Sequence, residues 1–386
     1  MHDSDCYGLL WCFIKLLGID IFEHRHDGKK KTANAVLKTF TNKLTKMFFP
    51  FMLHAMIIYG IISWIILCVK GVTTIEVLIS FTVSNLFSLA LWYDVRRKRN
   101  LIQNLVLKCR NLTFCLGLTQ MNIKGFVNLC LILSVTIPFG LTVFGTYAIS
   151  EAALQYKMFY SFFSILENGN HIFVLIESLI ILMTYTASLI LPALMTIISG
   201  AIYYKVSDLF GSICDKLESQ SHIPFEYDEI YKLLHIYNIL YKLVHEIEKV
   251  LSTTAFLLLF SEWLNLYLVL VILFKLDNRG FTDVITWESI FILVMGSLTV
   301  IAVVLCASRI SCQNHRFRSI LQLTHNCMLP NKENTNKTLL LIRAMLSMKF
   351  PRMTACGVLH LEPVLILSVF GSVLTYGLLV LNITKH

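Results

Sequence analysis

The sequence predicts an all-α membrane protein with seven transmembrane helices, and three observations support this fold class. The chain of 386 residues is 56% hydrophobic and only 15% charged, against about 45–50% and about 25% in a soluble globular domain. Its mean hydropathy is +0.68, and seven segments have the roughly 20 mostly apolar residues that a bilayer crossing needs. Finally, 28 of the 33 Lys and Arg residues fall in alternate loops.

The predicted spans are residues 47–69, 72–93, 126–147, 172–201, 250–274, 287–307 and 357–383. Only Lys70 and Gly71 separate the first two spans, so we expect these spans to form a tight helical hairpin. Pro138 and Pro192 interrupt the third and fourth spans. Such prolines can mark a transporter site, although a simple kink is much commoner.

The distribution of basic residues predicts the orientation. The loops that carry the 28 residues are 1–46, 94–124, 202–249 and 308–356. Since cytoplasmic loops are enriched in Lys and Arg, the N-terminus is expected in the cytoplasm and the C-terminus outside. The first residues are acidic where a signal peptide has a basic region, so the first span is expected to act as its own insertion signal. The net charge of +9 reflects this bias and does not indicate nucleic-acid binding.

The cytoplasmic segments predict a folded layer beneath the membrane. Residues 7–22 are too short and interrupted to span, which favours an interfacial or packed N-terminal helix. Residues 226–249 have one broad apolar face at helical spacing. We expect this amphipathic helix to continue into the fifth span and to pack against residues 308–352.

Cysteines and glycosylation motifs give further expectations from this topology. None of the 11 cysteines falls in a predicted extracellular loop, so reduced thiols are expected. Palmitoylation of Cys6 or Cys12 stays open. The motifs at Asn111 and Asn336 lie in predicted cytoplasmic loops, and neither is expected to carry a glycan.

Catalytic signatures are absent from the sequence. It contains no phosphate-binding glycine-rich loop, no His-Glu-x-x-His, no Cys-x-x-Cys and no Gly-x-Ser-x-Gly. We therefore expect no enzymatic activity, no cofactor and no metal site.

Two acidic residues at membrane depth and a group of aromatic residues suggest a small-molecule site. Buried charge in a bilayer is costly, so Glu177 and Glu262 either line a water-accessible pocket or hydrogen-bond to neighbouring helices. Apolar walls with a few polar groups are typical of ligand pockets. The aromatic residues in the predicted outer halves are Phe144, Tyr147, Phe173, Trp263, Tyr267, Trp287 and Phe291. An aromatic belt at the membrane interface is the alternative, and it accounts in part for Trp287.

The last predicted span carries a mostly polar stripe. Its members recur at steps of four and three, which places them along one helical face: Ser368, Ser372, Thr375, Leu379 and Asn382. The stripe suggests a face turned toward water in a pore. The alternative is packing between helices, which uses the same small residues.

Three classes of membrane protein are candidates for this pattern. A G-protein-coupled receptor has its N-terminus outside, and the Asp-Arg-Tyr and Asn-Pro-x-x-Tyr signatures are missing here. A secondary transporter is disfavoured by the odd number of spans and the lack of an inverted repeat. An oligomeric channel whose last helix lines the pore explains the stripe directly.

The C-terminal run from Thr354 to Tyr376 resembles the signature of insect gustatory receptors. In that family Thr-Tyr is followed, after five mostly hydrophobic residues, by Gln-Phe. Here Thr375-Tyr376 is followed at the same spacing by Asn382-Ile383. Asn keeps the side-chain amide of Gln, whereas Ile loses the aromatic ring of Phe.

The resemblance implies a ligand-gated, non-selective cation channel in the plasma membrane of sensory neurons, opened by a small-molecule tastant. It implies a homo- or hetero-tetramer in which residues 357–383 line a central pore and Asn382 and Ile383 form the outer constriction. Residues 47–307 then form the ligand-binding domain, and residues 308–356, with the helix extensions 202–249, form a cytoplasmic anchor.

An odorant receptor subunit of the same superfamily is the close alternative, because it shares the topology and a degenerate form of the motif. The intact Thr375-Tyr376 pair favours the gustatory branch. The class of ligand and the need for co-receptor subunits stay open.

Overall fold

The computed structural model describes residues 8–19, 33–71, 75–115, 124–149, 171–220, 227–275, 284–328 and 336–384. Nearly all of them are helical. The elements are α1 (Gly8–Leu16), α2 (Ala33–Val69), α3 (Ile75–Cys115), α4 (Lys124–Ile149), α6 (His171–Tyr185), η1 (Thr186–Ile190), α7 (Leu191–Gln220), α8 (Tyr227–Lys275), α9 (Val284–Met328), α10 (Asn336–Ser347), β1 (Thr354–Ala355), β2 (Leu359–His360) and α11 (Pro363–Thr384).

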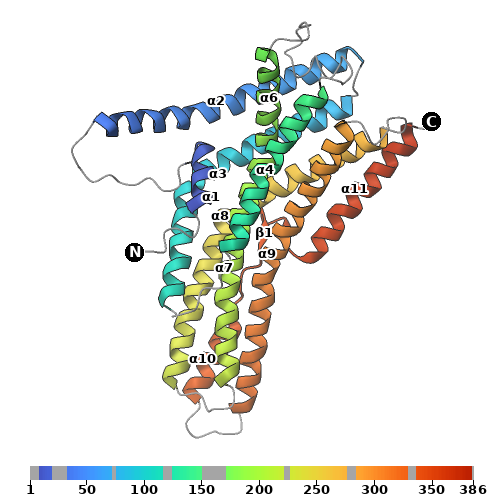
Figure 1. Ribbon diagram of the computed structural model, residues 1–386. Coiled ribbons are helices and arrows are strands. Elements are labelled where there is room, and N and C mark those ends of the chain that lie inside the picture. Colours follow the sequence, from blue (N-terminus) through green and yellow to red (C-terminus); the bar gives the residue numbers. More distant parts are fainter. Residues whose placement is uncertain are drawn as a thin grey trace.

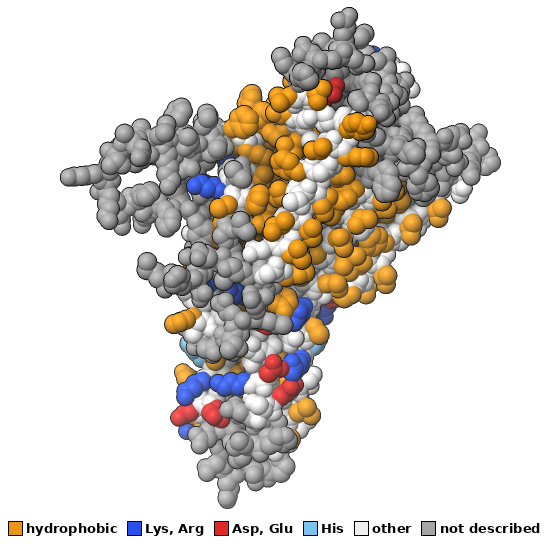
Figure 2. All heavy atoms as spheres, viewed as in Figure 1, with side chains coloured by type: hydrophobic (Ala, Val, Ile, Leu, Met, Phe, Trp, Pro, Cys, Tyr) orange, Lys and Arg blue, Asp and Glu red, His pale blue; other side chains and the backbone are white. Residues whose placement is uncertain are grey.

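Several helices are much longer than a bilayer is thick. Helix α8 has 49 residues, or about 74 Å at 1.5 Å per residue, whereas the hydrocarbon core measures about 30 Å. Figure 1 shows α7, α8 and α9 running side by side to one end of the molecule, where α10 joins them, while the C-terminus lies at the opposite end. Hydrophobic side chains cover the upper part of the visible surface and charged ones gather near the α10 end (Figure 2). The architecture is that of a multi-pass membrane protein with a folded layer outside the bilayer.

Five helices in the described part of the chain are long and apolar enough to cross a membrane. They include Phe48–Val69, Gly125–Tyr147, Val174–Ser219, Tyr227–Leu273 and Ser289–Met328. The predicted spans 72–93 and 357–383 are not among them. Helix α3 is described only from Ile75, and α11 contributes the shorter apolar stretch Pro363–Leu379. The number of seven crossings therefore stays a prediction.

Helices α2 and α3 pair as the predicted hairpin. The chain leaves α2 through Gly71, which has a positive φ of 71°, a conformation that glycine adopts without steric cost. Tyr93 of α3 donates a hydrogen bond to His54 of α2 over 2.7 Å. Nearer the turn, the rings of Trp64 and Phe81 lie 5.0 Å apart. Contacts at both levels establish antiparallel packing.

Polar side chains join α3 to α8 at successive turns inside an otherwise apolar interface. The pairs are Ser84 with Asn265, Ser88 with Ser261, and Asp94 with Thr254. Because buried polar groups are costly unless paired, these bonds specify the register between the two helices. Lys98 also lies 2.9 Å from Asp94, so this carboxylate has a basic partner on its own helix.

The packed helical layer that residues 226–249 predict is present in the structure. Helix α8 runs without a break from Tyr227 into the apolar span, and it packs on both α9 and α10. The rings of Tyr237 and Phe317 stack 4.8 Å apart in its core. At its surface, Arg316 of α9 bonds Asp215 and Glu218 of α7.

The N-terminal helix is packed rather than free. Leu10 and Ile14 of α1 are almost completely buried. The indole of Trp92, itself fully buried, donates a hydrogen bond of 3.0 Å to the carbonyl of Leu17. This anchors the end of α1 against α3.

The fourth predicted span is not one continuous α-helix. Residues 172–201 are divided among α6, the π-helix η1 and α7. The amide of Leu191 bonds the carbonyl of Thr186, five residues earlier. Pro192 follows at once and has no amide hydrogen to donate. A wider turn at this point accommodates the proline, so Pro192 coincides with a π-helical segment.

The seventh predicted span starts later than residue 357. Cys356 and Gly357 have positive φ values of 56° and 71°, and they lie in the turn between β1 and β2, which pair antiparallel. Helix α11 begins only at Pro363, in keeping with the preference of proline for the first helical turn. Residues 357–362 therefore belong to a hairpin that precedes the helix.

Candidate pore helix and ligand-binding site

Helix α11 is packed on one side only. Its inner side contacts α8 and α9, with Val373 3% exposed. On the other side Ser368, Thr375, Leu379 and Asn382 are all exposed in the protomer. Figure 1 shows α11 at the edge of the molecule. The face that carries four of the five predicted stripe residues is therefore available to other subunits or to water.

The hydroxyl groups of Ser368 and Thr375 are satisfied within the helix. Ser368 donates to the carbonyl of Val364, and Thr375 donates to that of Gly371. Such bonds let a hydroxyl lie in an apolar environment without an unpaired donor, while its oxygen can still accept from water. The stripe therefore suits both a wet pore and a helix interface.

Ser372 differs from the other stripe residues because it faces α8. It is half-buried, and its Oγ accepts a hydrogen bond of 3.0 Å from the indole nitrogen of Trp263. Of the stripe residues it lies nearest the packed side of α11. In the protomer this bond connects α11 to Trp263 of α8, one of the residues predicted to bind ligand.

The turn before α11 is tied to α8. The backbone amide of Thr354 bonds both oxygens of Glu248, at 3.2 and 3.0 Å. Its hydroxyl also bonds Glu248 and accepts from the amide of Gly357. The amide of Cys356 reaches the carbonyl of Ser252. These contacts set the position at which α11 begins.

Glu262 lies inside a helix interface, not at an open surface. It is 3% exposed and hydrogen-bonds the side chain of Asn265 one turn away on α8. Its carboxylate lies so close to Gly296 of α9 that an added Cβ there would be 2.8 Å from Oε2. This placement matches the internal hydrogen bonding that was the alternative to a water-accessible pocket.

A small cluster of buried hydrophobic residues lies between α4, α6, η1 and α9. Ile181, Tyr185 and Leu189 are buried there, and Phe291 packs against them. On the same elements, the hydroxyls of Thr146 and Ser178 lie 3.0 Å apart. Of the residues predicted to bind ligand, Phe291 belongs to this cluster. Glu177, the neighbour of Ser178 on α6, is half-buried and interacts with another group of the protein.

Of the remaining predicted ligand residues, three have side chains that the structure describes. On α4, Phe144 is 50% and Tyr147 is 68% exposed, as expected for rings that face lipid. Tyr267 of α8 is half-buried. The side chains of Phe173, Trp287 and Ile383 lie outside the described part of the structure.

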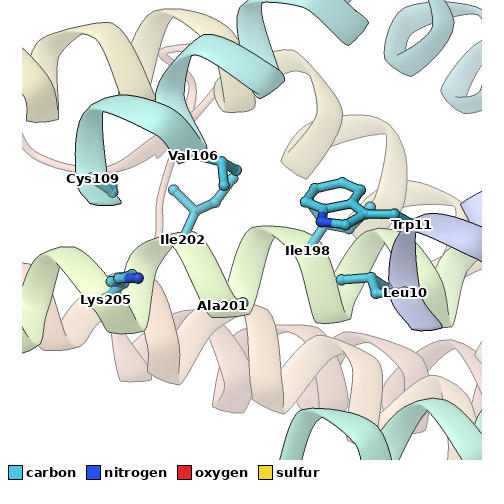
Figure 3. Close-up of a pocket in the computed structure, with 8 residues that line it drawn as sticks. All are labelled: Leu10, Trp11, Val106, Cys109, Ile198, Ala201, Ile202 and Lys205. Atoms are coloured by element: carbon cyan, nitrogen blue, oxygen red, sulfur yellow. The ribbon is translucent and has the colours of Figure 1, made fainter. Parts of the chain in front are cut away.

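A pocket that the sequence did not indicate lies between α1, α3 and α7. It is a half-open depression whose cavity volume is about 20 Å³, which is room for one water molecule. Its lining residues, shown in Figure 3, are Leu10, Trp11, Val106, Cys109, Ile198, Ala201, Ile202 and Lys205. None of the predicted ligand residues contributes to it. Its walls come from segments far apart in the sequence, so no local pattern marks it.

Comparisons with known proteins give the fold but no sequence family. No family profile matches the chain, and the curated proteins contain no match. Among solved structures, the insect olfactory receptor OR5 from Machilis hrabei matches with a TM-score of 0.60 and 14% identity, over 98% of this chain and 100% of that one. The same receptor in complex with eugenol matches with a TM-score of 0.56 and 13% identity over the same shares. The chain therefore has the fold of an insect olfactory receptor.

Proposed function

We propose that the chain is a gustatory receptor subunit, a ligand-gated cation channel that opens when a small tastant binds. The one-sided packing of α11 is the observation that carries this proposal. One side contacts α8 and α9, while the opposite side exposes Ser368, Thr375, Leu379 and Asn382. Four such helices around an axis would place this face on an ion path. The likeness of the fold to an olfactory receptor supports a chemoreceptor channel of either branch.

The distribution of basic residues supports the proposed membrane orientation. The α10 end of the molecule carries the charged side chains seen in Figure 2 and is assigned to the cytoplasm. The C-terminal end of α11 then lies outside, with Asn382 in an outer constriction. A ring of neutral amides would bind a hydrated cation weakly enough to let it pass, and Leu379 would form an apolar barrier one turn below.

The ligand is proposed to bind at the cluster of Phe291, Ile181, Tyr185 and Leu189. This cluster combines aromatic and aliphatic walls with nearby hydroxyls, and the π-helix η1 contributes Leu189. π-helical turns occur frequently at functional sites. The related fold binds eugenol, a small molecule, in the second solved structure. A ligand of that size class is therefore the first to test here.

The bond from Trp263 to Ser372 is proposed to couple α8 to the pore helix. A neutral hydrogen bond contributes about 0.5–1.5 kcal/mol, and 1.4 kcal/mol is a factor of ten in an equilibrium constant. Trp263→Phe keeps most of the ring and removes the donor, whereas Ser372→Ala removes the acceptor. Each should displace the half-maximal ligand concentration by about two- to tenfold in the same direction, and the double variant should displace it no further. Additive displacements would contradict the coupling.

An odorant receptor subunit is the second candidate, and the olfactory fold match favours it. The intact Thr375-Tyr376 pair favours the gustatory assignment. Current recordings with volatile odorants and with water-soluble tastants separate the gustatory from the odorant assignment. The chain is expressed alone and then with candidate co-receptors. A response to tastants supports the gustatory proposal. A response to volatiles alone contradicts it, and a lack of current under every condition contradicts both.

A further inference from the structure

Helix α10 and the part of α9 that it packs on are basic and contain no acidic residue. Residues 336–353 include four Lys or Arg and no Asp or Glu, and residues 308–328 of α9 also contain no Asp or Glu. Among the described residues, Arg318, Arg343 and Lys349 form no ion pair. These three cations therefore have no acidic partner in the described part of the chain.

Ser347, the last residue of α10, lies among these cations. Its side chain is exposed, and its Oγ donates a hydrogen bond of 2.8 Å to a carbonyl of its own helix. Arg343 lies one turn earlier on the same helical face, and Lys349 follows two residues later. The guanidinium of Arg318 on α9 donates to the carbonyl of Leu346, the residue next to Ser347. One exposed hydroxyl thus has basic residues on both sides along the chain and a third on the neighbouring helix.

The backbone that follows Ser347 is not helical. Residues 348–353 form no regular element before β1, and Pro351 has no amide hydrogen with which to continue the helix. Protein kinases bind the residues around the acceptor hydroxyl as an extended chain, so a serine at this position can enter their active site. Ser319 of α9 is also exposed beside arginines, but it lies inside a continuous helix, where its Oγ bonds the carbonyl of His315.

The cations lie too far from the bilayer to meet lipid headgroups. Arg318 follows Ala307, the end of the predicted sixth span, by 11 residues of one continuous helix. This spacing corresponds to about 16 Å at 1.5 Å per residue, whereas the polar headgroup region of one leaflet is about 5–8 Å thick. A phosphate group carried by the protein itself is therefore the better complement.

We propose that Ser347 is phosphorylated by a serine/threonine kinase that selects basic sequences. The γ-phosphoryl group of ATP is transferred to Oγ of Ser347, the hydroxyl proton passes to the catalytic base of the kinase, and ADP is released. The phosphate adds a charge of about −1.5 to −2 and pairs with Arg343 and with the N–H groups of Arg318 that Leu346 does not use. The end of α10 is thereby tied to α9. The proposal rests on the proposed orientation, which places α10 on the side of the membrane where ATP and kinases are found.

Phosphorylation of the purified full chain in detergent tests the site without any need for channel activity. The chain is incubated with ATP and either the catalytic fragment of protein kinase C, which prefers basic residues on both sides of the serine, or casein kinase 2, which prefers acidic ones. Peptide mapping by mass spectrometry should find phosphate on Ser347 with the first kinase only. No phosphate on Ser347, preferential modification of Ser319, or equal modification of Ser347 by both kinases would overturn the proposal.

Matched variants test the role of the basic residues. Arg343→Gln should lower the initial rate of Ser347 phosphorylation by about tenfold, as expected when one charge-assisted contact with the kinase is lost. Lys337→Gln, an exposed position near the other end of α10, should leave the rate unchanged. The phosphorylated chain should also melt at a higher temperature than the unmodified chain, and Arg318→Gln should abolish this difference. Equal rates in the two α10 variants, or a melting temperature that phosphorylation does not raise, would refute the assignment.

Phosphopeptide mapping from cells treated with a phosphatase inhibitor shows whether the site is used, and it depends on no variant. We expect phosphate on Ser347. A tag at the C-terminus reports the orientation separately in the same cells. If the tag is stained in intact cells and Ser347 carries no phosphate, the kinase site is wrong and the orientation stands. If the tag is stained only after permeabilisation, the orientation itself is contradicted.

Discussion

The contact between Glu248 and the hairpin that precedes α11 gives the sharpest prediction about stability. Glu248 accepts from the backbone amide and from the hydroxyl of Thr354. The carboxylate comes from the long helix α8, and the hairpin leads directly into α11. Glu248→Ala removes the acceptor for both donors, and Thr354→Val removes only the hydroxyl.

The structure sets the expected size of each effect. A hydrogen bond to a charged group contributes about 1.5–3 kcal/mol, and Glu248 is half-buried, so the lower end of this range applies. Loss of two such bonds in Glu248→Ala should lower the free energy of unfolding by about 3 kcal/mol. Thr354→Val should lower it by about 1.5 kcal/mol for the bond to Glu248, and by about 0.5–1.5 kcal/mol more for the bond that the hydroxyl accepts from the amide of Gly357. Relative to Glu248→Ala, the double variant should lose only this second amount, because both substitutions remove the bond between Thr354 and Glu248.

Thermal denaturation of the detergent-solubilised protein, followed by tryptophan fluorescence, provides the measurement. The matched control is Glu246→Gln, two residues away on α8, where the carboxylate forms an exposed pair with Lys108. Exposed pairs contribute about 0–1 kcal/mol, so this variant should melt close to the wild type. Equal losses in Glu246→Gln and Glu248→Ala, or additive losses in the double variant, would refute the reasoning.

Two further predictions concern packing and thiol chemistry. Gly296→Ala places a methyl group 2.8 Å from the Glu262 carboxylate and should cost about 1–3 kcal/mol of stability. Gly140→Ala, where no atom lies within 4 Å of the added methyl group, should be neutral or stabilising by up to about 1 kcal/mol. Equal melting temperatures of the two variants in the same assay would contradict this prediction. Since its pKa is raised to about 12, Cys109 stays a thiol and should resist maleimide from pH 7 to 9. Exposed Cys327 should be modified far sooner, and comparable rates in peptide mapping would contradict the burial of Cys109.

The sequence predicted the elements better than their contacts. Apolar length and helical periodicity located the helices of the bundle, including the unbroken passage of α8 from the amphipathic segment into its span. These features depend on local sequence. The start of α11 at Pro363 was missed because Val358, Leu359 and Leu361 continue the apolar pattern of the helix. The turn before it is shown by the positive φ values of Cys356 and Gly357 and by the pairing of β1 with β2.

The candidate site was harder to predict because it depends on which helices meet. Ser372 lies in a regular stripe, yet its contact with Trp263 depends on where α8 packs against α11. The spacing of residues within α11 does not reveal this packing. Glu262 was recognised as costly at membrane depth, but its fit against Gly296 depends on the packing of two helices. The π-helix had a local signal in Pro192, although a proline alone does not distinguish a kink from a wider turn.

The central claim is that Asn382 faces the ion path, and one measurement tests it most directly. Asn382→Cys is expressed at the cell surface and treated from outside with a positively charged methanethiosulfonate reagent while ligand-evoked current is recorded. Four added positive charges at the constriction should reduce the cation current strongly, and wild-type current should be unaffected. If mass spectrometry shows the cysteine fully modified and the current and its reversal potential are unchanged, Asn382 does not line the pore.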